Sequence, residues 1–323
     1  MPKPRILVTR RWPQAVEDLL EQEFDADFNI DDRALSPDEL RIAMTEYDAI
    51  LPTVTDRLGP EAFPDAAPRV QILANYGVGF SHIDTEAARR LGVAVTNTPD
   101  VLSDCTADLA MTLLLMAARR AGEGERELRA GDWSGWRPTH LVGSKVTGKT
   151  LGIIGFGRIG REMARRAHHG FGMRILVQNR SRVDPTVLAE FGATQVASVE
   201  DLLPECDFVS LHCPGGDANR HLINAERLAL MRGDAYLINT ARGEVIHEED
   251  LAKALTEGRI GGAALDVFEG EPAINPTLAC CDRLVMLPHL GSATRETREG
   301  MGLRALENLR AFFAGQEPPD RVA

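Results

Sequence analysis

The sequence lacks the features that mark disulfide-stabilised, zinc-binding and membrane-spanning proteins. Its five cysteines form no CxxC pair, and no cluster of residues has metal-ligand spacing, so no metal is expected: Cys105, Cys206, Cys213, Cys280 and Cys281. Such scattered cysteines favour a reducing, cytoplasmic setting over a disulfide framework or a zinc ribbon. The longest apolar stretch, 109–118, is too short to cross a bilayer. The apolar run at 6–8 is likewise too short for a signal peptide.

The sequence also has fewer basic than acidic residues. Lysine and arginine total 36 against 48 aspartates and glutamates, which gives a net charge of -12. An acidic chain has no general attraction for nucleic acid or anionic lipid, so neither is an expected partner. A local basic pocket for a phosphorylated small molecule stays open. A chain of 323 residues, 44% of them hydrophobic, is long enough for about two globular domains.

Apolar, strand-like runs alternate with helix-like segments along the chain, which indicates an α/β protein with parallel sheets. The first part predicts strands at 6–9, 49–52, 71–74 and 93–96, with helices at 13–23, 37–44 and 85–91. A second series predicts strands at 151–154, 174–178, 208–211, 235–239, 263–267 and 285–287. Six such strands suffice for a doubly wound sheet, so we expect two Rossmann-like or flavodoxin-like domains separated by a cleft.

Two segments are expected to connect these domains. Residues 100–121 predict one long helix that is apolar on all faces, and such a helix is buried in a core or in a subunit interface. On this ground we predict a homodimer. The second crossing is expected near 289–292, and the helix at 296–313 is expected to return to the first domain. The predicted domains are therefore 1–99 with 291–323, for substrate, and 100–290, for a dinucleotide; the Pro318-Pro319 segment is expected to fray.

A glycine-rich motif, Gly155-Phe156-Gly157-Arg158-Ile159-Gly160, lies between the strand at 151–154 and a helical pattern. In dinucleotide-binding folds the first glycine permits a tight turn, and the second lets the backbone approach the pyrophosphate. The third lets helix and strand pack closely, while the helix N-terminus attracts the phosphates. The motif therefore predicts a nicotinamide dinucleotide site.

The end of the next strand bears on which dinucleotide binds. It reads Gln178-Asn179-Arg180-Ser181-Arg182, without the carboxylate that NAD binders place there for the ribose 2′-hydroxyl. Two arginines and a serine instead suit a 2′-phosphate. NADPH is the predicted cofactor, and NADH is the alternative if both arginines are solvated loop charges.

Three later strands are each followed by a residue that hydride transfer to a 2-keto acid requires. Arg242, Glu271 and His289 come after the strands at 235–239, 263–267 and 285–287. The carboxyl ends of parallel strands border the ligand crevice, so these residues can converge. Arg242 can hold the substrate carboxylate and carbonyl oxygen, His289 can supply the proton, and Glu271 can orient the imidazole. Glu269 is the rival to Glu271.

The segments around Arg242, Glu271 and His289, spaced by 29 and 18 residues, resemble the signature of the D-isomer-specific 2-hydroxyacid dehydrogenase family. The resemblance covers almost the whole chain. Segments 133–138, 179–181 and 212–214 look most like glyoxylate/hydroxypyruvate reductases. This resemblance implies reduction of glyoxylate to glycolate and of hydroxypyruvate to D-glycerate. The substrate contacts expected from these considerations are Leu51, Val78, Gly79, Arg242, His289, Ser292 and Trp136. The expected cofactor contacts outside the glycine motif and the 179–182 segment are Thr106, His212, Cys213, Pro214, Thr240, Ala241, Asp266 and Gly291.

Two other functions stay open. An NAD-linked dehydrogenase of another D-2-hydroxy acid would share everything except the residues for the 2′-phosphate. The chain could instead be a dinucleotide-sensing binding protein, like the family's transcriptional corepressors, although an intact Arg242, Glu271 and His289 set argues against this. Trp136 is expected either to pack locally or to reach a partner subunit's cleft and narrow it for small substrates.

Overall fold

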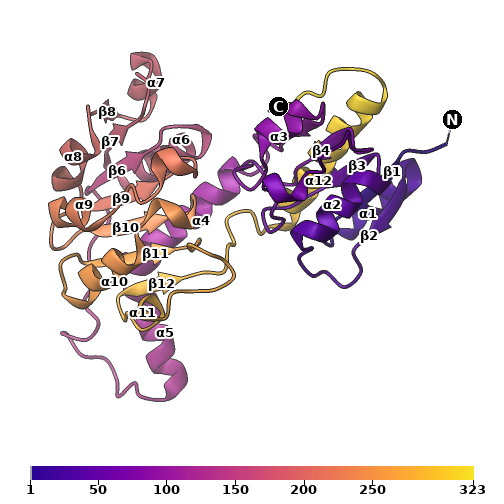
Figure 1. Cartoon of the computed structure of the whole chain (residues 1–323). Helices are drawn as coiled ribbons and strands as arrows, with labels where there is room; N and C mark the ends of the chain where they lie inside the picture. The colour runs from indigo at the N-terminus through magenta and orange to yellow at the C-terminus, as the bar shows by residue number, and fades with distance from the viewer. Residues whose placement is uncertain (1) are drawn as a thin grey trace. The chain divides into compact units, whose positions relative to one another are not determined.

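The computed structural model describes residues 2–323, which divide into two compact units (Figure 1). The first unit runs to Leu102 and resumes at Ser292–Ala323, and the second unit is Ser103–Gly291. The chain thus passes between units three residues and one residue beyond the boundaries expected from the sequence. Among the described residues, no helix is long and apolar enough to cross a membrane. Nor do residues 2–323 contain a group of three or more His, Cys, Asp or Glu side chains placed to hold a metal ion.

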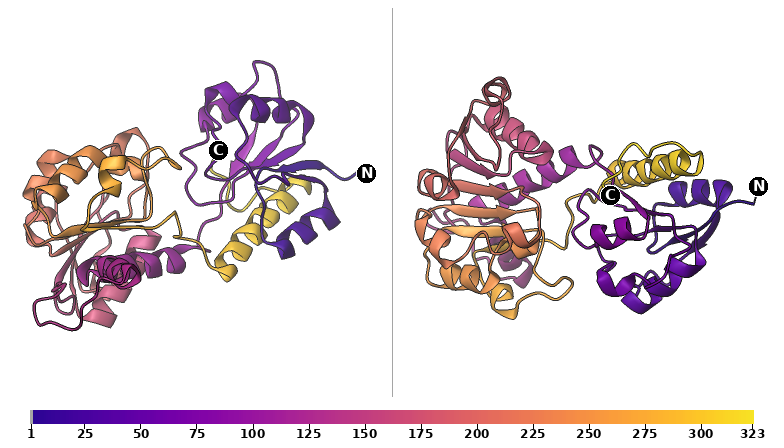
Figure 2. Two further views of the ribbon diagram at one scale, coloured as in Figure 1. Left: turned by 90° about the horizontal axis from the view of Figure 1, so that it is seen from below. Right: turned by 45° about the horizontal axis from the view of Figure 1, so that its top comes forward.

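The first unit is built on a five-stranded parallel sheet in the order β2-β1-β3-β4-β5. Its strands are β1 (Arg5–Val8), β2 (Asp25–Phe28), β3 (Ala49–Leu51), β4 (Ile72–Ala74) and β5 (Ala94–Thr96). Two helices pack together on one face and two cover the other (Figure 2): α1 (Gln14–Glu23) with α12 (Arg295–Phe313), and α2 (Pro37–Glu46) with α3 (Thr85–Arg90). The expected return of the last helix to the first domain is confirmed. Gly302 allows its close packing, because a Cβ there would lie 2.7 Å from a methyl carbon of Val16.

The second unit is built on a seven-stranded parallel sheet in the order β12-β11-β10-β9-β6-β7-β8. Its strands are β6 (Thr150–Ile154), β7 (Arg174–Gln178), β8 (Ala193–Gln195), β9 (Phe208–Leu211), β10 (Tyr236–Asn239), β11 (Gly262–Leu265) and β12 (Leu284–Met286). One core lies beneath α4 (Ser103–Ala118), α6 (Arg158–Arg165) and α7 (Pro185–Glu190). A second core lies beneath α8 (Val199–Leu202), α9 (Ala225–Leu230), α10 (Glu248–Thr256) and α11 (Pro276–Ala279). The strand order reverses between β6 and β9, where doubly wound folds bind their ligands. The expected α/β class with two parallel sheets is confirmed.

Both strands that the sequence pattern missed lie at sheet edges. Strand β2 alternates exposed acidic residues with half-buried ones, and β8 buries none of its three residues fully. Edge strands need little apolar surface because only one side pairs and solvent covers the other. A search for buried apolar runs therefore finds four strands and six, where the sheets have five and seven.

The helix expected at 100–121 is present as α4 (Ser103–Ala118). Helix α4 ends at Ala118, Arg120 adopts the left-handed conformation with φ 53°, and α5 (Ala121–Ala130) follows. Eight residues of α4 are buried, and the helix packs on β10, β11 and α6 of its own unit. Its apolar surface thus belongs to a core, so a homodimer has to be argued from another surface.

The segment after Pro318-Pro319 is held in place, so the prediction that it frays is wrong. Asp320 is buried, and Arg321 pairs with Thr96 in antiparallel fashion. The Val322 N–H donates to the Val95 carbonyl at 2.8 Å. These backbone hydrogen bonds attach residues 321–323 to the edge of β5 and offset the entropy that a free segment would keep.

Candidate active site

The glycine motif lies at the point where the strand order of the second unit reverses. Gly155 has φ +93°, and a Cβ there would lie 2.6 Å from the backbone nitrogen of Cys213, at the end of β9. A Cβ on Gly160 would lie 2.3 Å from the Gly155 carbonyl oxygen. Gly157 differs. Among residues 2–323, apart from Gly157 and its two chain neighbours, no atom lies within 4 Å of a Cβ built on it. Two glycines are therefore required by close packing, and the middle one leaves the space that a pyrophosphate needs.

Helix α6 begins directly after Gly157, which is its N-cap. Within the described chain no side chain caps this end, and the N-terminus of a helix attracts an anion through its dipole. Phe156 is buried and Ile159 packs against the same core, whereas Arg158 is exposed. The buried Phe156 side chain therefore supports the turn and is not available to a dinucleotide. The residues present fit a bound dinucleotide, whose nicotinamide supplies the hydride when it is bound.

Asn179 joins the end of β7 to the glycine motif. Its Oδ1 accepts the Phe156 N–H at 3.1 Å, and its Nδ2 donates to the Ser181 carbonyl at 3.1 Å. Gln195 of β8 holds the same loop, since its Nε2 donates to the Ser181 carbonyl at 3.0 Å. Arg180 and Arg182 are exposed, and neither guanidinium has a hydrogen-bond or ion-pair partner in the part of the chain that the structure describes. Two uncommitted cations thus flank Ser181 beside the glycine motif. Gln195 was missed because β8 was missed.

The residues after β9, 212–214, have side chains that do not titrate near neutral pH. Burial lowers the pKa of His212 to about 4, and its Nε2 pairs with the Ser210 hydroxyl at 2.8 Å, so the imidazole is neutral at neutral pH. Burial raises the pKa of the Cys213 thiol to about 11. The Pro214 carbonyl accepts the Asn219 side chain at 2.9 Å. None of these groups is an acid or base for chemistry at neutral pH.

Thr240, directly after β10, has a hydroxyl group without a hydrogen-bond partner among residues 2–323. This hydroxyl is also buried. Buried polar atoms are nearly always satisfied, so this oxygen fits a bound group such as the predicted cofactor. The neighbouring Ala241 differs, because its N–H donates to Asn239 Oδ1 and its carbonyl accepts Arg242 Nη1.

Glu271 and His289 form the centre of the site. His289 Nδ1 lies 2.8 Å from Glu271 Oε2, and Glu271 Oε1 accepts the Phe268 N–H at 2.9 Å. Burial by itself would raise the pKa of Glu271, but the hydrogen bond and charge of His289, the Phe268 N–H and the Arg242 guanidinium together hold it below its usual value. An ionised carboxylate keeps the imidazole proton on Nδ1 and leaves Nε2 for a substrate. Both side chains are about one third exposed, so a ligand can reach them.

Arg242 completes the set after β10. Burial lowers the pKa of its guanidinium, whereas the charges of Glu244 and Glu271 raise it. Its Nη1 donates to the Ala241 carbonyl at 2.6 Å, and its own carbonyl accepts Asn239 Nδ2 at 2.9 Å. Arg242 and His289 thus both interact with Glu271, as expected from the strand ends that carry them.

Asp266 holds the loop that carries His289. Its two carboxylate oxygens accept the N–H groups of Leu290 at 2.6 Å and Gly291 at 2.8 Å. His289 itself has φ +54°, a conformation that non-glycine residues rarely adopt. Burial raises the pKa of Asp266, against the opposing effects of these N–H groups and of His289. Thr106 Oγ1 donates to the Gly291 carbonyl at 3.1 Å. Asp266 and Thr106, expected to face the cofactor, are engaged in positioning this loop.

Glu269, the rival of Glu271, belongs to a different cluster. Its carboxylate pairs with Arg220 and lies 3.0 Å from His221 Nε2, while its N–H donates to Glu248 Oε1 at 2.6 Å. The choice of Glu271 as the partner of the histidine agrees with this geometry. Glu248 and His221 were not singled out from the sequence. An acidic residue in the first turn of a helix just after a site strand is the signal that could have found Glu248.

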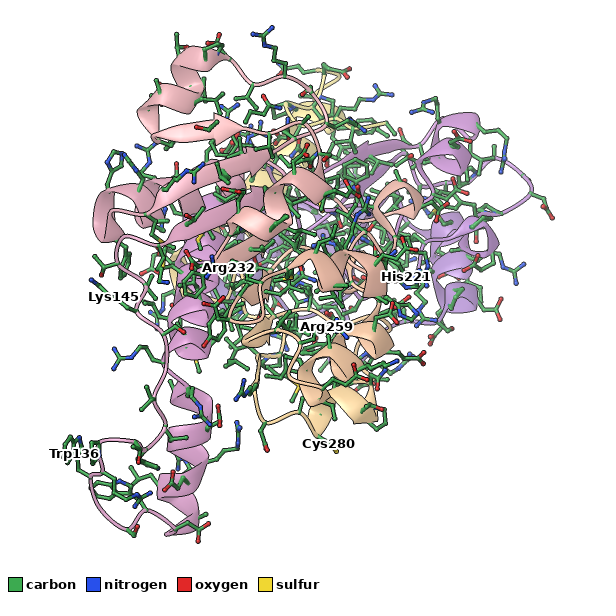
Figure 3. The ribbon with its side chains drawn as sticks, turned by 90° about the vertical axis from the view of Figure 1, so that its left-hand side faces the viewer. Trp136, Lys145, His221, Arg232, Arg259 and Cys280 are labelled. Atoms are coloured by element: carbon green, nitrogen blue, oxygen red, sulfur yellow. The ribbon has the colours of Figure 1, made fainter. Side chains whose placement is uncertain are left out.

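The remaining expected substrate residues lie elsewhere in the chain. Leu51 ends β3 and is fully buried, and Val78 and Gly79 are partly exposed in the loop after β4. Ser292 is partly exposed where the first unit resumes. Trp136 belongs to the second unit and is 82% exposed. Figure 3 shows it at the tip of a loop that extends, with α5, away from the rest of that unit.

The chain is similar to known proteins along its whole length. Residues 111–291 match the NAD-binding domain of the D-isomer-specific 2-hydroxyacid dehydrogenases. The chain is 46% identical over 324 residues to a glyoxylate reductase of Thermococcus kodakarensis, covering 99% of this chain and 96% of that protein. A solved glyoxylate reductase from Paecilomyes thermophila has a TM-score of 0.85 at 33% identity, with 100% and 99% of the two chains covered. An NADPH-dependent glyoxylate/hydroxypyruvate reductase from Sinorhizobium meliloti, solved with NADP and malonate, has a TM-score of 0.87 at 33% identity, with 99% and 97% covered. The chain therefore belongs to the D-isomer-specific 2-hydroxyacid dehydrogenase family and is an NAD(P)-dependent enzyme of that family.

Proposed function

We propose that this enzyme reduces glyoxylate to glycolate and hydroxypyruvate to D-glycerate with NADPH as the hydride donor. The observation that carries the proposal is the His289–Glu271 hydrogen bond of 2.8 Å, with Arg242 acting on the same carboxylate at the carboxyl edge of a dinucleotide-binding sheet. The names of the relatives from Thermococcus and Sinorhizobium support the substrate class.

Each residue of the set has one task in the proposed reaction. The guanidinium of Arg242 binds the substrate carboxylate and polarises the carbonyl oxygen. His289 donates its Nε2 proton to that oxygen as the carbonyl carbon accepts the hydride, and Glu271 stabilises the imidazole in the required orientation. The products are the 2-hydroxy acid and the oxidised nucleotide, so protons and electrons balance.

The preference for NADPH is proposed to come from Arg180, Ser181 and Arg182. We expect Arg180→Ala and Arg182→Ala each to raise the KM for NADPH about 10- to 100-fold, because each removes charge-assisted hydrogen bonds to the 2′-phosphate. The KM for NADH should change little. Steady-state kinetics that follow nicotinamide absorbance, with both cofactors, measure the effect. Arg174→Ala is the matched control, since Arg174 is an exposed arginine at the opposite end of β7.

The same assays, with a panel of glyoxylate, hydroxypyruvate, pyruvate and phenylpyruvate, test the proposed function as a whole. A wild-type enzyme that prefers NADH, with both arginine variants unaffected, would be an NAD-linked dehydrogenase of another 2-hydroxy acid. Tight NADPH binding without turnover of any keto acid would instead indicate a dinucleotide-sensing protein.

A homodimer is proposed from the surface of α5 and the loop that follows it. None of the α5 residues is buried, and the region exposes large apolar side chains: Leu128, Trp133, Trp136 and Val142. Apolar side chains gathered at such a surface are typical of protein interfaces, and tryptophan often dominates their binding energy. The segment around Trp136 extends away from the rest of its unit (Figure 3).

We expect Trp136→Ala to weaken the dimer about 30-fold, because loss of a dominant interface tryptophan costs about 2 kcal/mol. The preference for glyoxylate over phenylpyruvate should fall in parallel if this side chain narrows the partner's site. Sedimentation at several protein concentrations and kinetics with both substrates measure the two effects. If the dissociation constant of the dimer and the substrate preference both equal the wild-type values, Trp136 has neither of these roles.

A further inference from the structure

The loop after β4 has its carbonyl groups held and two of its N–H groups free. The Val78 carbonyl accepts Asn97 Nδ2 at 2.9 Å, and the Gly77 carbonyl accepts the Thr98 N–H at 3.1 Å. Asn75 Nδ2 donates to the Gly77 and Gly79 carbonyls at 3.0 and 3.1 Å. Within the described chain, the N–H groups of Val78 and Gly79 donate to no partner. A loop fixed by its carbonyls presents its free N–H groups to an anion such as a carboxylate.

Asn97, which follows β5, is itself held by Asn308 and Asp320. Its N–H donates to the Asp320 carbonyl at 3.2 Å, and its carbonyl accepts Asn308 Nδ2 at 3.3 Å. Asn97 and Asp320 are each exposed by less than a tenth, and Asn308 of α12 is fully buried. The position of the Asn97 side chain, and with it the Val78 carbonyl, therefore depends on residues more than 200 positions later in the chain.

The polar atoms of Asn308 are all satisfied, which is what a buried amide requires. Its Nδ2 also donates to Asp320 Oδ2 at 2.9 Å and to the Arg304 carbonyl at 3.0 Å, and its Oδ1 accepts the Asp320 N–H at 3.0 Å. Two nitrogens of Arg304 bind the Asp320 carboxylate at 2.6 and 2.8 Å. An apolar side chain could fill the same volume, but it could not fix a backbone position through directed bonds. We name Asn97, Asn308, Asp320 and Arg304 the Asn97 network.

We propose that the Asn97 network positions the 77–79 loop for binding of the substrate carboxylate. The residues after Pro319 are then a positioning element of the first unit, because Asp320 anchors Asn97 and residues 321–323 pair with β5. This inference rests on the proposed function in one respect: the anion that the Val78 and Gly79 N–H groups receive is the carboxylate of a small 2-keto acid. Asn97, Asn308 and Asp320 touch no reacting atom and act through the loop.

Two leucine substitutions test the proposal, because leucine keeps the bulk of asparagine and removes its hydrogen bonds. We expect Asn97→Leu and Asn308→Leu each to raise the KM for glyoxylate about tenfold. This factor corresponds to the free energy of about one hydrogen bond between the loop and the substrate. The value of kcat and the KM for NADPH should stay within about twofold, since the network lies outside the dinucleotide-binding unit. The Gly77 N–H donates to the Asn75 carbonyl and the Thr98 N–H donates to the Gly77 carbonyl. Hydrogen exchange of these two amides should become faster in both variants.

Leu309→Ala is the matched control, because it weakens the packing of the same helix at a fully buried position and joins no part of the network. A rise in the glyoxylate KM no larger than that of Leu309→Ala overturns the proposal, as does unchanged exchange at Gly77 and Thr98. If the wild-type enzyme reduces no keto acid, the proposed function has failed, but the exchange comparison still decides whether the network fixes the loop.

Discussion

His289→Asn is expected to lower kcat for glyoxylate reduction about 10²- to 10⁴-fold, the usual contribution of a positioned acid–base group. Asparagine tolerates the left-handed conformation of position 289 (φ +54°) better than most residues, so the loop should keep its path. The substitution removes the titratable proton and leaves the dinucleotide site untouched. Stopped-flow or steady-state kinetics measure kcat, and fluorescence titration of NADPH should give a Kd within about twofold of the wild-type value. A kcat within tenfold of wild type would show that another group delivers the proton.

Glu271→Gln separates orientation from proton transfer. The amide keeps the size of the carboxylate and a hydrogen-bond acceptor for Nδ1, but it lacks the charge that stabilises an imidazolium, so kcat should fall less than in His289→Asn. Because the folded-state pKa of Glu271 lies below the usual 4.5, the interactions that lower it contribute stability that is fully present above that pH and is lost as the pH falls through the lowered value. The free energy of unfolding should therefore differ between wild type and variant by about 0.5 kcal/mol at neutral pH, after allowance for solvent screening. An equal difference at acidic pH would contradict this assignment.

The elements that position the site were the most predictable from the sequence. Strand β6, the glycine motif and α6 follow one another without interruption, and close packing gives Gly155 and Gly160 each a steric reason to be glycine. Strands β7 and β9 were placed with the bounds observed. Buried parallel strands are continuous apolar runs, so their pattern is strong, and polar residues at their ends are then easy to find.

The predictions that were wrong or left open concern features that depend on contacts between residues distant in sequence. The apolar helix expected at 100–121 could face a core or a partner subunit, and only the contacts of α4 with β10, β11 and α6 assign its surface to a core. Residues 320–323 were expected to fray since prolines precede them, but their partners are Val95, Asn97 and Asn308. A periodicity argument sees neighbours along the chain and cannot see a hydrogen bond across more than 200 residues.

The site shows the same division between local and distant information. The rivalry between Glu269 and Glu271 could not be settled from spacing, because both lie in one loop two residues apart. The structure directs Glu269 to Arg220 and His221, and Glu271 to His289. Asp266 was expected at the cofactor because it ends a strand, but two backbone N–H groups take its oxygens.

Arg242→Ala is expected to lower kcat/KM for glyoxylate about 10²- to 10⁴-fold. A guanidinium that binds a carboxylate in bidentate fashion makes two charge-assisted hydrogen bonds, each contributing about 1.5–3 kcal/mol. Burial strengthens the effect, because water replaces the lost cation poorly at a half-buried position. The KM for NADPH is expected to change by less than about threefold. Kinetics over a range of glyoxylate concentrations measure the loss.

Alanine at position 242 also removes the cation that acts on both Glu244 and Glu271, so a loss of activity could come from repulsion between these carboxylates. Arg242→Lys answers this point, because lysine keeps the charge and loses the planar fork. If the fork is what binds the substrate, Arg242→Lys should fold with wild-type stability and still lose about 10- to 100-fold in kcat/KM, mostly through the glyoxylate KM. If charge alone suffices, Arg242→Lys should come within a few-fold of wild type, and the role of Arg242 would reduce to an electrostatic one.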